Sequence, residues 1–202
     1  SFAVFNPGRN WEQIRVSVCM NNANVKIVGG HAGFGNGFDG ANQQAFEDIA
    51  IMRCLPNMRV VVPVDYEQVK KALVAVVESS GPCYLRITKP NRPVITTNMT
   101  PFELGRAQVI KSGNDVTVVA CGQMVYEALV AAYDLVGRID VGVINVHTIK
   151  PIDRETIVLH AKRSGRVLVA EEHSVVGGFG GTVAELLGEE YPAKMRFVGM
   201  DD

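Results

Sequence analysis

Short runs of β-branched residues alternate with longer amphipathic stretches along this chain, and that alternation restricts its fold more than any other feature. The runs VKIVGG (25–30) and RVVVP (59–63) are almost continuously apolar, as expected for strands covered on both faces of a parallel sheet. Between them, residues 43–55 repeat apolar side chains at helical spacing, at Ala45, Ile49, Met52 and Leu55. Strands that alternate with helices in this way predict an α/β fold with mostly parallel sheets covered by helices.

The same pattern repeats after residues 90–101, a stretch with three prolines and little periodicity that predicts a linker. Before the linker, we expect a strand over 83–87 and a helix after the N-cap residue Asp65. After it, strands are expected over 115–120, 140–146, 166–170 and 195–198, with helices over 123–136 and from Gly180 onward. We therefore predict two consecutive three-layer α/β units, over residues 1–95 and 105–202.

The balance of charge and hydrophobicity excludes several classes of protein. Of the 202 residues, 47% are hydrophobic, which is enough for a core in each unit and argues against a disordered chain. The 20 Lys and Arg residues nearly balance the 21 Asp and Glu residues, so we expect no nucleic-acid partner. No apolar run reaches the roughly 18 residues of a membrane-spanning helix, and the first residues do not resemble a secretory signal. We expect a soluble protein without a membrane partner.

The cysteines and histidines are scattered rather than clustered. Cys19, Cys54, Cys83 and Cys121 form no CxxC pair, and each stands among apolar residues, which predicts small buried side chains in a reducing compartment. The four histidines include no HExxH pattern. We therefore expect a cytoplasmic protein without a metal site of its own.

The glycine-rich segment 29–48 is the strongest candidate for chemistry. It reads GGHAGFGNGFDGANQQAFED and lies directly after a predicted strand and before a predicted helix. Ligands of α/β sheets bind beyond the carboxyl ends of the strands, where glycines let the backbone approach them closely. His31, Asp39 and Gln43 can hydrogen-bond a substrate there. The alternative is a turn whose polar residues only cap local helices; the segment matches neither a Walker loop nor a diphosphate–magnesium motif.

A second glycine-rich segment, EEHSVVGGFGGTVAE (171–185), also lies between a strand and a helix. It follows a late strand, whereas a dinucleotide site would follow the first strand of its unit, so we favour close helix–sheet packing or a subunit contact. His173 beside Glu171 and Glu172 is a candidate acid/base pair. A solvated or interface histidine is the simpler interpretation.

Two smaller groups of residues are ambiguous by themselves. Phe2 and Phe5 are spaced to stack on a flat ligand, although core packing is the commoner role of such residues. Arg86, Lys89 and Arg92 form a basic cluster at a strand exit, which can meet a phosphate group or can simply be a solvated edge.

Several segments taken together resemble one family. They are FAVFNPGRNWEQIR (2–15), the stretch from GGHAGFGNG to RVVVPVD (29–65), GPCYLR (81–86), IKPID (149–153) and EEHSVVGGFGG (171–181). In this order they resemble the C-terminal half of the transketolase-like thiamine diphosphate enzymes. The resemblance is strongest to a split transketolase, in which separate polypeptides supply the two halves.

The resemblance implies a pyrimidine-binding domain over 1–95 and a transketolase C-terminal domain over 105–202. In that family thiamine diphosphate lies between subunits. Its aminopyrimidine docks on the first of these domains, and a different domain holds its diphosphate and Mg²⁺. Phe2, Phe5 and Arg9 would then bind the cofactor, with the two rings stacking on the aminopyrimidine.

The resemblance also assigns residues to the sugar substrate. His31, Asp39 and Gln43 would form the catalytic set, with Asp39 meeting a sugar hydroxyl. His31 would meet the phosphorylated end of the sugar, and Lys89 stands near a family arginine that binds sugar phosphate. Most transketolases carry a histidine where this chain has Gln43, and a glutamine can hydrogen-bond a hydroxyl but cannot shuttle a proton near neutral pH.

Two parts of the family's machinery are not found in these 202 residues. The glutamate that activates the cofactor normally lies upstream of Phe2, and the diphosphate and metal motif is also absent. We therefore expect a chain that is inactive alone, binds an N-terminal transketolase subunit or domain, and forms a homodimer of this half.

The expected reaction is the transfer of a two-carbon ketol group from a ketose phosphate to an aldose phosphate, as in the pentose phosphate pathway. Three alternatives stay open: an enzyme like 1-deoxyxylulose-5-phosphate synthase, the β subunit of a 2-oxo-acid dehydrogenase E1 component, and a non-catalytic assembly module. Gln43 and the missing glutamate both permit the last of these.

Overall fold

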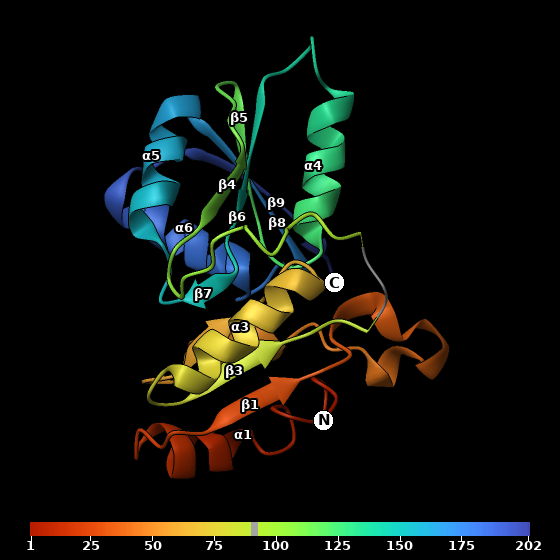
Figure 1. Ribbon diagram of the computed structural model, residues 1–202, viewed down its shortest axis with the longest axis vertical. Helices are drawn as coiled ribbons and strands as arrows, with labels where there is room; N and C mark the ends of the chain where they lie inside the picture. The colour runs from red at the N-terminus through yellow and green to blue at the C-terminus, as the bar shows by residue number, and fades with distance from the viewer. Residues whose placement is uncertain (90–92) are drawn as a thin grey trace.

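Two α/β units stacked along the long axis of the molecule make up the computed structural model, which describes residues 1–89 and 93–202 (Figure 1). The unit built mainly from the first half of the chain, coloured red to yellow, lies at the bottom of the view. The green to blue second half lies above it.

The first sheet contains β1 (Lys26–Gly29), β3 (Cys83–Arg86), β2 (Arg59–Val61) and β7 (Thr148–Lys150), in that order across the sheet. β1, β3 and β2 run parallel, whereas β7 joins the edge of β2 in the antiparallel direction. β7 comes from the second half of the sequence, so that half contributes a strand to the first sheet. We did not predict β7, because three residues are too few to show a period.

The second sheet contains β4 (Gln108–Lys111), β6 (Val141–Asn145), β5 (Val116–Ala120), β8 (Arg166–Ser174) and β9 (Lys194–Met200), in that order. All neighbours are parallel except the edge strand β4, which is antiparallel to β6. Four of these strands lie where the sequence predicted them; β4, a partly exposed edge strand, was missed. The two mostly parallel sheets confirm the predicted α/β fold class.

Helices cover both faces of each sheet. In the first unit, α1 (Trp11–Gln13), its π-helical continuation η1 (Ile14–Cys19) and α2 (Asp48–Arg53) lie on one face, and α3 (Tyr66–Glu78) lies on the other. In the second unit, α4 (Met124–Asp134) covers one face, while α5 (Arg154–Ser164) and α6 (Phe179–Glu190) cover the other. Among the residues described, no helix has both the length and the hydrophobicity to cross a bilayer.

The core explains why the strands are apolar throughout. Successive residues of a strand face opposite sides of the sheet. In β2, Val60 shares a cluster with Ile49 of α2, whereas the next residue, Val61, shares one with Ala72 of α3. A strand buried on both faces needs apolar side chains at odd and at even positions alike, which gives the continuous apolar runs seen in the sequence.

Two local predictions were wrong in part. The helix expected over 43–55 begins only at Asp48, because the carbonyl groups that a longer helix would use are bound elsewhere. Asn36 donates to the carbonyl of Gln43, and the carbonyl of Ala45 accepts from Gly33. Among the four free cysteines, three are buried as expected, but Cys54 is exposed at the end of α2.

The two units are joined by direct contacts at the carboxyl edge of the second sheet. The amide of Ser174 donates to the carbonyl of Phe46 over 2.9 Å, and the amide of Val62 donates to the carbonyl of His147 over 2.7 Å. Residues 90–92 of the predicted linker lie outside the described residues. Beyond them, the amides of residues 95 and 96 donate to the carboxylate of Asp65, which fastens the following segment to the start of α3.

Candidate active site

The first candidate residues meet where β1 ends. Phe2 forms a parallel bridge with Gly30, so the N-terminal segment lies beside the exit of β1. His31 follows in the left-handed backbone region, with φ of 59°, and its ring stacks on that of Phe2 with centroids 4.0 Å apart. The structure therefore brings together a predicted cofactor residue and a predicted substrate residue.

Phe5 and Arg9 extend this aromatic group. The rings of Phe2 and Phe5 are nearly parallel, at 15°, with centroids 6.2 Å apart, and both are partly buried. The guanidinium of Arg9 lies over the Phe5 ring at 5.1 Å. Flat apolar faces beside a cation suit an aromatic heterocycle better than a plain aliphatic core does.

The chain then forms a compact loop of two 3-10 segments, η2 (Gly33–Asp39) and η3 (Ala41–Gln43). Asn36 lies at its centre, and its side-chain nitrogen donates to the carbonyl groups of His31 and Gln43. Phe34 packs on Phe46 with ring centroids 4.5 Å apart. The Asn36 side chain thus connects the two ends of the loop and holds the backbone of Gln43 close to that of His31.

Asp39 and Lys89 come together from two strand exits. β1 and β3 are parallel neighbours, so the segments that leave their carboxyl ends lie side by side. The Lys89 ammonium lies 3.1 Å from the Asp39 carboxylate, and the two side chains are 44% and 38% exposed. An open ion pair of this kind can exchange partners with a ligand, because little of its energy depends on burial.

The basic cluster predicted around Lys89 is wrong as a surface feature. Arg86 is buried, and its guanidinium binds the Asp48 carboxylate at 2.8 Å and the carbonyl groups of Ala45 and Glu172. It therefore faces inward and meets no ligand. Arg92 lies outside the described residues. Of the two cluster members that the structure describes, Lys89 reaches the open loop.

Asp48 is a structural residue that we did not single out from the sequence. Besides the ion pair with Arg86, its carboxylate accepts a hydrogen bond of 2.7 Å from the Tyr84 hydroxyl. Burial raises the pKa of Tyr84 above its usual range, so the hydroxyl stays protonated and donates. The only sequence signal was an acidic residue at the start of an otherwise apolar helix.

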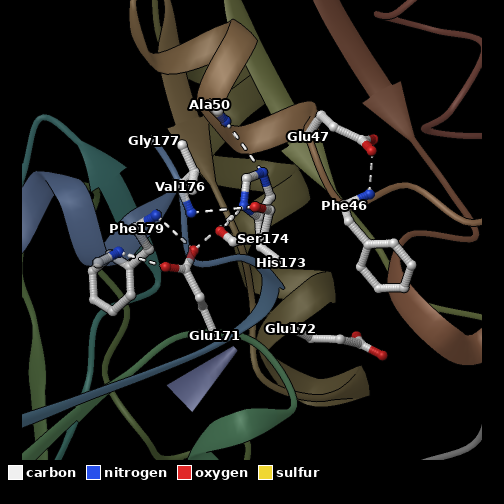
Figure 2. Close-up of polar contacts among 12 residues, drawn as sticks. Phe46, Glu47, Ala50, Glu171, Glu172, His173, Ser174, Val176, Gly177 and Phe179 are labelled. Atoms are coloured by element: carbon white, nitrogen blue, oxygen red, sulfur yellow. Dashed lines mark hydrogen bonds and ion pairs between the residues drawn. The ribbon is translucent and has the colours of Figure 1, made fainter. Parts of the chain in front are cut away.

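The second glycine-rich segment has a different arrangement (Figure 2). The Glu171 carboxylate accepts hydrogen bonds from the backbone amides of Phe179 and Gly180, at 2.6 and 2.7 Å, at the start of α6. A Cβ added at Gly178 or Gly180 would lie within 3 Å of the Glu171 carboxylate. These glycines therefore allow close helix–sheet packing, as we expected, and the carboxylate caps the helix.

His173 Nδ1 lies 3.7 Å from Oε2 of Glu171, so the structure brings the candidate pair together, but both ring nitrogens are also bound to the backbone. His173 is fully buried, and its Nδ1 lies 2.8 Å from the carbonyl of Ser174, to which it donates because a carbonyl can only accept. Nε2 then accepts from the amide of Ala50 in α2, at 3.3 Å. Figure 2 shows the imidazole pointing across to α2. The candidate acid/base pair is therefore an interface contact between the two units.

No group of three histidine, cysteine or acidic side chains within residues 1–89 and 93–202 is placed to hold a metal ion. The described candidate residues form four contacts: Phe2 on His31, Phe2 on Phe5, Arg9 over Phe5, and Lys89 on Asp39. Gln43 is connected to His31 through Asn36.

Two family models together match most of the chain. Residues 1–94 match the model for the transketolase pyrimidine binding domain, and residues 105–202 match that for the transketolase C-terminal domain. The chain belongs to the transketolase family.

Relatives within the transketolase family include proteins whose names describe parts of an enzyme. A 6-deoxy-6-sulfo-D-fructose transketolase subunit from Clostridium sp. (strain MSTE9) is 40% identical over 203 residues, which cover 100% of this chain and 63% of the relative. A putative transketolase C-terminal section from Methanocaldococcus jannaschii is 40% identical over 206 residues, covering 100% of this chain and 64% of the relative. This chain therefore spans a little over three fifths of these relatives.

Solved structures of transketolases share the fold. A split gene transketolase, described as an inactive beta4 tetramer, superposes with a TM-score of 0.92 and 45% sequence identity, covering 100% of this chain and 66% of that chain. A transketolase mutant from Pichia stipitis superposes with a TM-score of 0.73 at 21% identity, covering 98% of this chain and 29% of that one. The second likeness concerns the fold alone.

Proposed function

We propose that this chain is the C-terminal portion of a transketolase, which transfers a two-carbon ketol group from a ketose phosphate to an aldose phosphate. In this proposal an N-terminal subunit or domain completes the enzyme, and the chain alone is inactive. The first domain, over residues 1–95, carries the cofactor's aminopyrimidine and part of the sugar site, and residues 105–202 form the C-terminal domain.

The observation that carries the proposal is the meeting of Asp39 and Lys89 at the carboxyl ends of β1 and β3. A carboxylate accepts hydrogen bonds from sugar hydroxyls, and an ammonium donates to a phosphate oxygen. Both side chains are open to solvent, so a sugar phosphate can reach them. The pair thus combines the two recognition chemistries that a phosphorylated sugar requires.

The aromatic group fits the expected cofactor. Phe2 and Phe5 present nearly parallel, partly buried rings that would hold an aminopyrimidine by stacking, and Arg9 would support Phe5 through its cation–π contact. When bound, thiamine diphosphate supplies the nucleophilic carbon and the electron sink that breaks the carbon–carbon bond of the ketose. As the family resemblance implies, we assign the diphosphate and Mg²⁺ to the N-terminal portion.

The side chains of this chain would bind and orient the sugar. Asp39 accepts from a hydroxyl, and Lys89 and His31 donate to the phosphorylated end. Gln43 can donate to one hydroxyl and accept from another, but it does not titrate, so it orients the sugar without moving a proton. Proton transfers in which most transketolases use a histidine therefore fall to other groups in the complete enzyme.

The test is reconstitution with an N-terminal transketolase subunit, thiamine diphosphate and Mg²⁺, followed by a ketol-transfer assay. We expect no turnover from the chain alone and turnover from the pair. Lys89→Ala should raise KM for phosphorylated donors by about a hundredfold, since one charge-assisted contact is lost. Lys70→Ala is the matched control, because Lys70 is also exposed and paired with an acidic residue, Glu67, but lies on α3. Full activity of the Lys89 variant would overturn the assignment.

The names of the relatives favour a second choice of donor. One relative is named for a sulfonated ketose, and another, 36% identical, is a subunit of an apulose-4-phosphate transketolase from Phocaeicola vulgatus. A sulfonate and a phosphate are both tetrahedral oxyanions that Lys89 can meet. The assay should therefore compare these donors with pentose phosphates, and pyruvate and branched 2-oxo acids should be included to test the two enzyme alternatives.

A non-catalytic assembly module is distinguished by Asp39→Ala in the reconstituted pair. Under our proposal turnover falls by about a hundredfold, because the sugar loses a positioning contact. Unchanged turnover, with unchanged association of the two subunits, would favour an assembly role.

A further inference from the structure

The loop between β1 and α2 contains one buried polar side chain to which the proposed reaction gives no role. Asn36 is 0% exposed, although the residues that follow it, 37–39, are exposed. Its Nδ2 donates to the carbonyl of His31 over 2.7 Å and to the carbonyl of Gln43 over 2.8 Å. These are the first and the last of the residues assigned to the sugar in this loop.

The two carbonyl groups determine which way the Asn36 amide points. A carbonyl oxygen can only accept, so both must face the amide nitrogen, and the amide oxygen must point away from them. Within the described chain Oδ1 has no hydrogen-bond partner. Both protons of the amide are therefore used to connect the two ends of the loop, and reversing the amide would set oxygen against oxygen.

His31 depends on this connection more than its neighbours do. A histidine in the left-handed region, here with φ of 59°, costs on the order of 1 kcal/mol and persists only where surrounding contacts hold it. Three contacts do so: Asn36 holds its carbonyl, the Phe2 ring stacks on its imidazole, and the amide of Ala32, in the peptide that follows, donates to the carbonyl of Ile87 over 3.2 Å. Without the first, this peptide keeps only the hydrogen bond of its N–H group, so it can tilt about that bond and the imidazole can shift off the Phe2 ring.

Gln43 is held in a similar way. Its backbone N–H donates to the carbonyl of Gly40 over 3.0 Å, and its backbone carbonyl accepts from Asn36, so the backbone of this residue is fixed on both sides. Gly40 itself has φ of 84°, which turns the chain back toward Asn36. The Asn36 amide therefore sets the separation between the exit of β1 and the start of the segment that leads to α2.

We propose that Asn36 is the positioning residue of this site: by bonding the carbonyls of His31 and Gln43, it holds the His31 imidazole on Phe2 and fixes the backbone of Gln43 at the other end of the loop. The inference rests on the proposed function in so far as it takes His31 and Gln43 to contact the sugar. The geometric part of the inference does not depend on any activity.

The first experiment measures the geometry in the 202-residue chain. Stacking at 4.0 Å places the His31 ring protons in the ring current of Phe2, so their NMR signals should lie upfield of the usual histidine position. A Phe2→Leu variant gives the unstacked reference. Asn36→Leu, which keeps the branching at Cγ and removes both donors, should move these signals most of the way to that reference. Asn36→Ser, with one shorter donor, should give an intermediate position.

Asn21 supplies a matched control. Its Nδ2 also donates to two backbone carbonyl groups, those of Val16 and Ser17, but the residue is exposed and lies on another segment. Asn21→Leu should leave the His31 signals in place. If Asn36→Leu also leaves them in place while the chain is folded, the proposal is overturned.

A measurement on the unaltered chain covers the case in which Asn36→Leu does not fold. Both protons of the Asn36 side-chain amide should exchange with solvent much more slowly than those of Asn21, because they are buried and bonded. Equal exchange rates would overturn the proposed connection.

The second experiment uses the reconstituted enzyme. A misplacement of about 1 Å in a substrate contact can cost a hundredfold in rate, so Asn36→Leu should lower kcat/KM by about that factor and change both kcat and KM. Asn21→Leu should change neither. Unaltered kinetics with displaced His31 signals would show that Asn36 positions the loop but that His31 and Gln43 do not serve the sugar, which separates the two proposals.

Discussion

The two glycine-rich strand exits of this chain have similar sequences and opposite surroundings. In the first, Asp39 and Lys89 are about two-fifths exposed, and Phe38 extends fully into solvent. In the second, Glu171 and His173 are buried, and their polar atoms bond to the backbone of α6 and α2. An acidic residue and a histidine beside glycines therefore belong to an open loop in one case and to a closed joint in the other.

The difference arises from what covers each sheet edge. The carboxyl edge of the second sheet faces the first unit, so the polar groups at this edge form hydrogen bonds that hold the two units together. Ser174, for example, donates to Phe46 across this joint. The loop after β1 also contacts the second unit, where the amide of Phe34 donates to the Glu172 carboxylate over 2.8 Å, but Phe38, Asp39 and Lys89 lie outside this contact and are exposed. In a chain of this kind, the partners of a polar residue decide whether it can meet a ligand, and its neighbours in sequence do not.

The largest effect is expected from Arg86→Met, because Arg86 ties the two exits together. Its guanidinium binds Asp48 in the first unit and the carbonyl of Glu172 in the second. The variant leaves the Asp48 carboxylate buried without its cation, which should lower the free energy of unfolding by about 3–5 kcal/mol. Urea denaturation at pH 7 measures this.

Arg53→Met is the control for that prediction, since Arg53 also joins the two units. Its ion pair with Glu185 is more exposed, at 18% and 64%, so its loss should cost about 1 kcal/mol. Equal losses of unfolding free energy for the two arginine variants would mean that burial of an ion pair does not determine its contribution to stability here.

A pH dependence of stability is expected from His147, which follows β6 at the closed joint. The side chain is fully buried and stacks on Phe102, and burial lowers its pKa to about 4, against the opposing effect of Asp153. Between an unfolded pKa of about 6.5 and a folded pKa of about 4, only the unfolded chain binds the proton. Stability is therefore full above about pH 6.5 and falls by up to roughly 3 kcal/mol as the pH drops to about 4.

Denaturation midpoints at several pH values between 4.5 and 7.5 test this window. A His147→Gln variant lacks the titrating group, so its stability should fall less over the same range. His160, whose pKa burial also lowers, leaves a remaining slope in both proteins. Parallel pH profiles for the variant and the unaltered chain would contradict the role given to His147.

The sequence predicted the parallel sheets and most of their strands because buried parallel strands are apolar at every position. It missed the strands β4 and β7 and the helix α5, whose residues Arg154–Ser164 are too polar to show a clear apolar stripe. It also predicted a polar loop of His31 and Asp39 after β1, but the same pattern did not distinguish this loop from the buried exit of Glu171 and His173. It did not predict that Arg86 points inward, because its partner, Asp48, is distant in sequence.

Glycine-to-alanine replacements at the two exits should differ in their cost in unfolding free energy, by less than the preceding substitutions. In Gly178→Ala the new Cβ would lie 2.3 Å from Glu171 Oε2 and 2.4 Å from His173 Nδ1, so the joint must shift. We expect a loss of about 1–3 kcal/mol in unfolding free energy, typical of overpacking. In Gly37→Ala, on the open loop, the Cβ meets nothing within 4 Å, and the change should stay within about 0.5 kcal/mol. Urea denaturation compares them directly, and a larger loss at Gly37 would reverse the comparison.

The smallest effect on stability is expected from Asp39→Asn. The variant removes the ion pair with Lys89, whose side chains are 38% and 44% exposed, so solvent and salt already screen most of its energy. The free energy of unfolding should change by less than about 0.5 kcal/mol, and the difference should shrink further in about 1 M salt. A loss above about 1 kcal/mol would place Asp39 with Glu171, as a residue that holds the fold. Retained stability with reduced ketol transfer in the reconstituted enzyme would instead confirm the difference between the two exits. Asp39 would then contribute to ligand binding without contributing to the stability of the fold, whereas Glu171 is bound within the fold.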